Sequence, residues 1–67
     1  MIVLNGESSE AHAGETVAEL LLGMGLDVDA RGIAVAVDGE VVPRASWGSF
    51  ALEQDARVEV LTAMQGG

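Results

Sequence analysis

Apolar and polar positions follow one another in short blocks along the chain, and the first blocks predict a β-hairpin. The apolar stretch 1–4 runs into Asn5-Gly6, the dipeptide that most favours a two-residue hairpin turn because both positions accept positive φ. The polar stretch 7–12 follows and is typical of a short edge strand, whose charges discourage pairing with other chains. The chain therefore opens with one apolar and one polar strand.

A helical pattern begins at Thr16. Thr16 and Glu19 are spaced as a capping box, in which each side chain accepts a hydrogen bond from the other residue's backbone N–H. Gly25 is placed to stop the helix, because glycine readily adopts the left-handed conformation that follows a last turn. Between these signals, apolar residues recur at the spacing of one buried helical face: Val17, Leu20, Leu21 and Met24.

The second half of the chain predicts another hairpin and a final strand, separated by an irregular connection. In chain order these are a buried strand over 33–37, a tight turn at Asp38-Gly39, a return strand over 40–42 that Pro43 ends, a connection over 44–52 and a strand over 57–63.

One helix laid across one mixed sheet is the simplest arrangement that buries the apolar faces of all these elements. The sequence thus predicts an α+β fold with four to five strands packed on one main helix. We expect a single domain over residues 1–63 and a flexible C-terminal tail over 64–67, because 67 residues can build only one small core.

The composition is strongly acidic: eleven Asp and Glu face three Arg, and the formal net charge is −8. Such a charge repels nucleic acids and anionic membranes, so we expect neither as a partner. It suits docking on basic patches of other proteins, and it equally suits keeping a small domain soluble and monomeric. No leader-like segment or membrane-length apolar run is visible, which favours a cytoplasmic protein.

Candidate catalytic groups are scarce. The chain has no cysteine, which excludes disulfides and Cys-based metal or redox sites. His12 is the only histidine and has no second ligand to share a metal, so we expect it to be solvated. No base is evident to activate any of the serines. The sequence therefore predicts a protein that is not itself an enzyme and holds no metal.

Two stretches carry a resemblance to a known family. Residues 38–44 read Asp-Gly-Glu-Val-Val-Pro-Arg and are followed by Trp47, which resembles the signature of ThiS, the ubiquitin-like sulfur carriers of thiamine biosynthesis. The terminal Gly66-Gly67 is the second element. The opening stretch, the helix start and the last strand also match, so the resemblance covers the whole chain.

The resemblance implies a β-grasp fold and a carrier role. One departure is the turn before the last strand, which often reads Gly-Asp in this family and here reads Asp55-Ala56. Asp tolerates the left-handed conformation better than most residues, so we expect the turn to be kept.

The same resemblance implies that Gly67 carries the reactive carboxylate. An adenylating enzyme similar to ThiF would use ATP and magnesium to form an acyl-adenylate on Gly67. A sulfurtransferase or cysteine desulfurase would supply the sulfur of a thiocarboxylate. A thiazole synthase similar to ThiG would accept that sulfur, and the chain itself would bind no cofactor.

Glycine suits such a tail for a physical reason. Gly66 and Gly67 have no Cβ, so an extended tail can pass through a channel too narrow for side chains. We expect Gln65 and Met64 to enter the partner's site behind them.

Alternation along the last strand predicts a docking surface. If Glu59 faces solvent, Leu61 and Ala63 share its face, while the valines on either side of Glu59 point toward the helix. We hypothesise that Leu61 and Ala63 form an exposed apolar patch with Val3.

Two residues of the connection have open interpretations. Trp47 either anchors a partner, as Trp often does at interfaces, or packs the connection against the sheet. Arg44 either pairs with a partner's acid or makes local hydrogen bonds.

The alternatives to a thiazole-pathway carrier are of two kinds. The small subunit of molybdopterin synthase also ends in Gly-Gly and carries sulfur, and other metabolites could receive sulfur from such a carrier. A protein modifier or a plain interaction module is the alternative of a different class.

Overall fold

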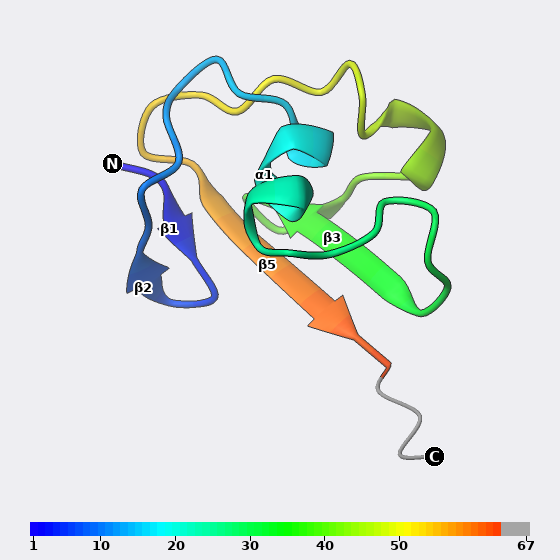
Figure 1. Ribbon diagram of the computed structural model, residues 1–67. Coiled ribbons are helices and arrows are strands. Elements are labelled where there is room, and N and C mark those ends of the chain that lie inside the picture. The colour runs from blue at the N-terminus through cyan, green and yellow to red at the C-terminus, as the bar shows by residue number, and fades with distance from the viewer. Residues whose placement is uncertain (64–67) are drawn as a thin grey trace.

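The computed structural model describes residues 1–63, which form one mixed sheet with a helix across it (Figure 1). The elements in chain order are β1 (Val3–Leu4), β2 (Glu7–Ser8), α1 (Val17–Gly23), β3 (Ile33–Val37), β4 (Glu40–Val41), the 3-10 helix η1 (Arg44–Ser46) and β5 (Arg57–Thr62).

The sheet has five strands in the order β2-β1-β5-β3-β4, so the last strand lies at its centre. β1 runs parallel to β5, and the other neighbouring pairs are antiparallel. The predicted α+β arrangement, a β-grasp fold with one main helix, is confirmed. No helix within residues 1–63 is long and apolar enough to cross a bilayer.

Both predicted hairpin turns are present. Asn5 and Gly6 have φ values of 50° and 83°, and Asp38 and Gly39 have 51° and 85°. Positive φ at both central residues is the backbone that matches the twist of the flanking strands. The two dipeptides therefore set the pairing of β1 with β2 and of β3 with β4.

The first hairpin is shorter than the sequence predicts, because β2 ends at Ser8 and not near His12. Both the backbone N–H and the hydroxyl of Ser9 donate to the carbonyl of Ile2, at 3.0 and 2.9 Å. The Ser9 hydroxyl also accepts from the N–H of Ala11. The backbone bond from Ser9 to Ile2 continues the pairing of the two strands by one step. The hydroxyl bonds of Ser9 offer the backbone a local alternative to further pairing, and the chain turns away from the sheet.

The helix begins as predicted. Thr16 is the N-cap, its Oγ1 accepts from the Glu19 N–H at 3.1 Å, and its own N–H donates to Glu19 Oε1 at 2.9 Å. Gly25 follows the helix with φ 81°. The prediction that Met24 belongs to the buried face is wrong, because the last turn ends at Gly23 and Met24 caps it from an exposed position.

The core lies between α1 and the facing side of the sheet. Its centre is formed by fully buried side chains from the residue before β1, from α1, from β3, from the connection and from β5. The largest of these are Ile2, Leu21, Leu52, Val17, Val35 and Val58.

Candidate functional site

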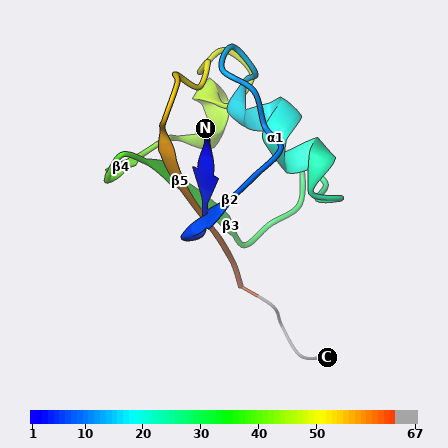
Figure 2. The same ribbon diagram turned by 90° about the vertical axis from the view of Figure 1, so that its left-hand side faces the viewer.

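The face of the sheet opposite α1 is the main candidate for a docking site. Figure 2 shows α1 on one side of the sheet, and no described element covers the other side. On β5, Val58 and Val60 are buried toward the helix, whereas Glu59 and Leu61 are exposed on the outer face. The alternation predicted from the sequence is confirmed.

The outer face carries an apolar patch that extends beyond the predicted residues. Val3 pairs with Arg57 on the outer side of β5, and one shallow groove joins Val3 to Leu61. A second groove joins Leu61 to β3 and β4. We call the exposed or half-buried apolar side chains of this face the outer patch: Val3, Ala34, Ala36, Val41 and Leu61.

The register of the sheet explains how β3 and β4 contribute side chains to the outer patch. Ala34 pairs with Leu61, and Ala36 lies between Glu59 and Val41. Leu61 is 68% exposed and Val41 is 77% exposed, so both project from a surface that the alanines keep shallow. The sequence analysis missed the β3 and β4 members, although the alternation of large and small residues in 33–37 was a signal for them.

The described chain ends next to this patch. Ala63 is exposed and its N–H donates to the carbonyl of Gly32 at 2.6 Å. The sites predicted at Met64, Gln65, Gly66 and Gly67 lie outside the described residues.

An asparagine side chain extends the pairing of β5 past the end of β1. The Oδ1 of Asn5 accepts from the Val60 N–H at 2.8 Å, and its Nδ2 donates to the Val60 carbonyl at 3.3 Å. The Asn5 backbone N–H donates to the carbonyl of Val58 at 2.8 Å. Asn5 therefore makes the hairpin turn and also holds β5 beside the outer patch, a second role that the Asn-Gly pattern did not reveal.

Trp47 does not belong to the docking surface. Its side chain is only 3% exposed, and its Nε1 donates to the Val42 carbonyl at 2.9 Å. The structure supports the packing interpretation, and the prediction of Trp47 as a docking residue is corrected because a buried indole presents no surface to a partner.

Arg44 makes local hydrogen bonds. Its guanidinium donates to the carbonyls of Val28 and Ala30 and lies over the Trp47 ring, with Cζ 4.6 Å from the ring centroid. A guanidinium has a fork of donors that can serve two acceptors at once. Of the two open interpretations, the local one fits these contacts.

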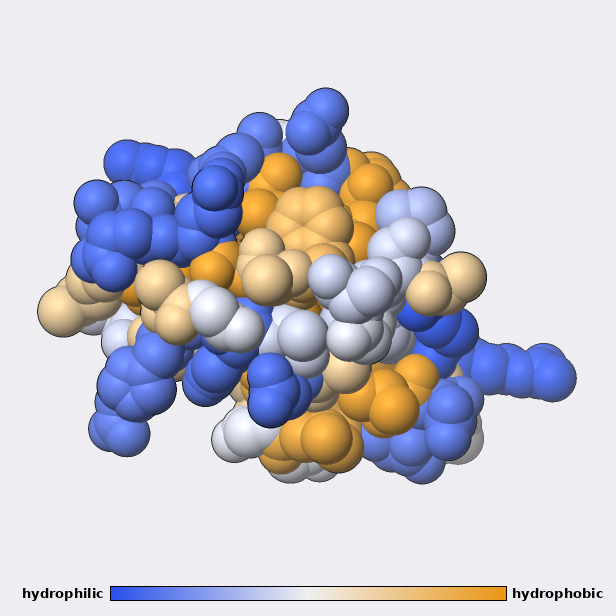
Figure 3. Space-filling model, turned by 90° about the horizontal axis from the view of Figure 1, so that it is seen from above, coloured by the Kyte–Doolittle hydropathy of each residue, from blue (hydrophilic) through white to orange (hydrophobic). Residues whose placement is uncertain are grey.

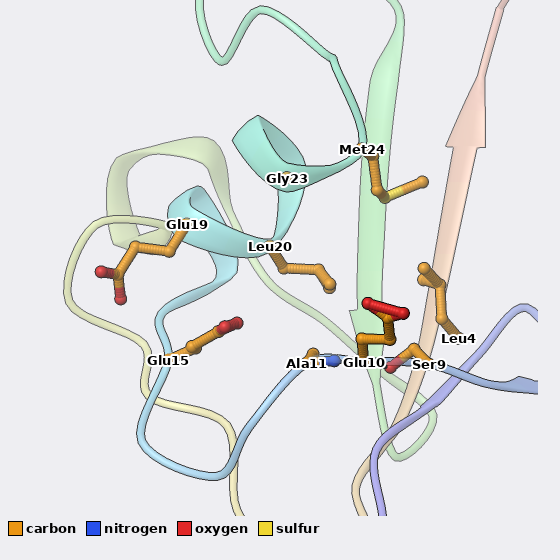
Figure 4. Close-up of a pocket in the computed structure, with 9 residues that line it drawn as sticks. All are labelled: Leu4, Ser9, Glu10, Ala11, Glu15, Glu19, Leu20, Gly23 and Met24. Carbon is orange, nitrogen blue, oxygen red and sulfur yellow. Dashed lines mark hydrogen bonds between the residues drawn. The ribbon is translucent and has the colours of Figure 1, made fainter.

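A depression on the helix side has an apolar floor and acidic rims (Figure 4). Leu4, Leu20 and Met24 point into it, while the Glu19 carboxylate points away toward its capping contacts. Within residues 1–63, no three acidic or histidine side chains are grouped so that they could hold a metal ion.

Seen from the loop end of the molecule, hydrophilic side chains surround a small apolar area (Figure 3). Among the described carboxyls, that of Asp55 is perturbed. The N-terminal ammonium of Met1 donates to Asp55 Oδ1 at 2.5 Å, and this contact holds the pKa of Asp55 below its ordinary value. Asp55 has φ 65°, so the turn that departs from the family pattern does use Asp in the left-handed conformation.

Solved structures confirm the fold. The crystal structure of a thiamine biosynthesis protein, ThiS, from Geobacter metallireducens has a TM-score of 0.75 at 26% identity, over 98% of this chain and 97% of that one. A solution NMR structure of a thiamine biosynthesis protein from the same organism has a TM-score of 0.77, also at 26% identity, over 98% and 86%.

Sequence comparisons point the same way. The chain is 38% identical over 66 residues to a thiazole synthase of Magnetococcus marinus, covering 98% of this chain and 20% of that protein, so it spans only a fifth of that relative. A thiazole synthase of Paramagnetospirillum magneticum matches with the same figures. The sulfur carrier protein ThiS of Escherichia coli is 30% identical over 98% of this chain and 97% of its own length. The sequence model of the ThiS family matches residues 2–67, and the chain therefore belongs to the ThiS family.

Proposed function

We propose that the chain is a sulfur carrier for the thiazole moiety of thiamine, acting as a co-substrate of other enzymes and not as a catalyst. The observation that carries the proposal is the family match over residues 2–67, which includes Gly66 and Gly67. The nearly full-length match to the Escherichia coli sulfur carrier supports it. This role places the protein in the cytoplasm with its ATP-dependent partner.

The chemistry takes place on the carboxylate of Gly67. A carboxylate is a poor electrophile, so a ThiF-like enzyme with ATP and magnesium first forms the acyl-adenylate and releases pyrophosphate. The terminal sulfur of a persulfide on a sulfurtransferase or cysteine desulfurase then attacks the acyl carbon and AMP leaves. A thiol reduces the resulting acyl disulfide, which releases the thiocarboxylate. Gly66 lets the tail pass through a narrow channel with Gln65 and Met64 behind it.

The outer patch supplies the docking surface in this proposal. Leu61 and Val41 project from an uncovered face, and the described chain ends beside that face at Ala63. A partner that covers the patch is therefore close to the start of the tail. Exposed apolar side chains grouped on one face are typical of interaction sites.

The acceptor of the sulfur is a ThiG-like thiazole synthase. Two proteins named thiazole synthase contain a segment 38% identical to this chain within a much longer polypeptide. A shared polypeptide keeps two parts at high effective concentration, which favours transfer between them. A separate carrier must instead dock, which is the role given to the outer patch.

Thiol-reactive labelling tests the proposal directly. The chain has no cysteine, so after incubation with a ThiF-like enzyme, ATP, magnesium and a sulfur donor, only an added sulfur can react. Peptide mass spectrometry locates the label, and we expect it on Gly67. An unlabelled chain in a reaction that modifies a known sulfur carrier would contradict the proposal.

Replacing Gly66 tests the tail. In Gly66→Val the new branched side chain cannot enter a channel shaped for glycine, so we expect adenylation to fall at least about 100-fold, as misplacement of a reacting group does. Pyrophosphate release measures the rate, and an unchanged melting temperature serves as the control. Undiminished adenylation of the variant would contradict the threading of the tail.

A further inference from the structure

The end of β5 lies opposite Gly32, the glycine that precedes β3. β3 and β5 pair up to Ile33 and Thr62, and the N–H of Ala63 continues the pairing to the carbonyl of Gly32 at 2.6 Å. The start of β3 and the end of β5 therefore meet at one end of the sheet (Figure 1). Ala63 is the last described residue, so this bond is made at the end of the described chain.

Gly32 suits this contact better than a residue with a side chain would. It has φ 79°, and a Cβ added there would lie 3.1 Å from the Cβ of Ala63 and 3.3 Å from its carbonyl oxygen. Gly39, at the other end of β3, has a similar φ of 85° but open space around it. Glycine is therefore favoured at position 32 both by the backbone conformation and by the close approach to Ala63.

The turn that leads into Gly32 is tied to the core. The Arg44 guanidinium donates to the carbonyls of Val28 and Ala30 and lies over the ring of buried Trp47. Within the turn, Asp27 Oδ1 accepts from the N–H of Asp29 at 2.8 Å. A chain of contacts thus runs from the core through Arg44 and the turn to Gly32.

We infer that Gly32 and Arg44 are positioning residues that fix the direction of the backbone at Ala63, the last described residue. The inference rests on the proposed function, because its consequence is the delivery of Gly67 to an adenylating enzyme. The four residues beyond Ala63 span at most about 14 Å when extended, so a small rotation at Ala63 displaces their end by several ångströms. A displacement of about 1 Å is enough to slow a reaction about 100-fold.

A pair of glycine variants separates positioning from general strain. Gly32→Ala and Gly39→Ala both force alanine into a positive φ, but only Gly32→Ala meets Ala63. Amide hydrogen exchange of the Ala63 N–H reports the contact without any partner. We expect this N–H to exchange at least about 10-fold faster in Gly32→Ala than in the unmodified chain. In Gly39→Ala we expect its exchange rate to change only as far as the global stability of the protein changes.

Steady-state adenylation then reports the consequence. With a ThiF-like enzyme and ATP, we expect Gly32→Ala to lower kcat for pyrophosphate release about 10-fold or more while KM stays within about twofold, because docking on the outer patch is untouched. We expect Gly39→Ala to leave kcat and KM unchanged when they are calculated from the concentration of folded protein.

Arg44→Lys provides a second, milder variant in case Gly32→Ala does not fold. Lysine keeps the charge but lacks the fork that holds two carbonyls. We expect a kcat decrease of about threefold or more, whereas the matched Arg31→Lys, in the turn just before Gly32, leaves kcat unchanged.

The outcomes are distinguishable. An Ala63 N–H that exchanges freely in the unmodified chain, or a Gly32→Ala kcat equal to that of Gly39→Ala, would overturn the inference and leave the carrier function intact. An unmodified chain that no ThiF-like enzyme adenylates would overturn the proposed function instead, and the exchange comparison would still decide whether Gly32 holds Ala63.

Discussion

The sheet has two apolar faces, and they are used differently. Toward α1, β3 and β5 present valines that are buried, whereas on the opposite face the same strands present alanines, Glu59 and Leu61. The inner side chains are large and interlock with the helix. The outer ones are small on β3 and exposed on β5. Apolar character alone therefore does not identify the core. Residues on the face that α1 covers stabilise the fold, and residues on the uncovered face are available to a partner.

The largest expected effect comes from the inner face. Leu21→Ala removes a side chain with 0% exposure and leaves a cavity, so we expect it to lower the free energy of unfolding by about 2–5 kcal/mol. Leu22→Ala is the matched control, because the next residue of the same helix is 60% exposed and its loss changes stability by about 0.5 kcal/mol or less. Urea unfolding followed by circular dichroism measures both, and equal losses would break the distinction between the two environments.

On the outer face we expect a substitution to impair docking and to leave stability nearly unchanged. Leu61→Asp places a charge in the outer patch, so we expect the KM for adenylation to rise about 10-fold while stability changes by about 0.5 kcal/mol or less. Leu22→Asp adds the same charge on the helix side and is expected to leave KM unchanged. A folded Leu61→Asp variant that is activated normally would remove Leu61 from the docking surface.

The smallest effect is expected for the ion pair between Met1 and Asp55, just before β5. Asp55→Asn keeps a residue that tolerates positive φ but removes the ion pair with the Met1 ammonium. Because that contact lowers the pKa of Asp55 below 3.8, its stabilisation is present above that pH and is lost as pH falls through the lowered value.

Thermal unfolding from pH 7 to pH 2 measures this difference between the unmodified chain and Asp55→Asn. Both groups are exposed, so we expect a small difference at pH 7 that vanishes in acid. A stability difference between the two proteins that grows below pH 4 would contradict this account, because the ion pair is lost in acid.

Local signals predicted most of the fold. Asn5-Gly6 and Asp38-Gly39 each specify a turn by the φ values that they accept, and Thr16 and Glu19 specify a helix start by their spacing. Met24 was placed wrongly because periodicity does not show where the last turn ends. Each of these signals lies within a few residues of the structure that it determines.

The residues that form the site depend on contacts between distant parts of the chain. Leu61 and Val3 could be assigned to one face by alternation, but Ala34 and Val41 join them only through the register of β3 with its neighbours. Gly32 precedes an apolar strand like many glycines, and nothing near it in the sequence indicates that Ala63 lies against it. Arg44 was equally suited to a partner's acid until the carbonyls of the turn were seen beside it.

The central position of β5 has a consequence for biosynthesis. Both hairpins flank this strand, so the ribosome must complete Arg57–Thr62 before either hairpin has its neighbour in the sheet. Nascent chains that stop earlier keep unpaired strand edges and exposed apolar side chains, which chaperones and proteases recognise. The native state is therefore reached only by chains in which translation has continued through β5.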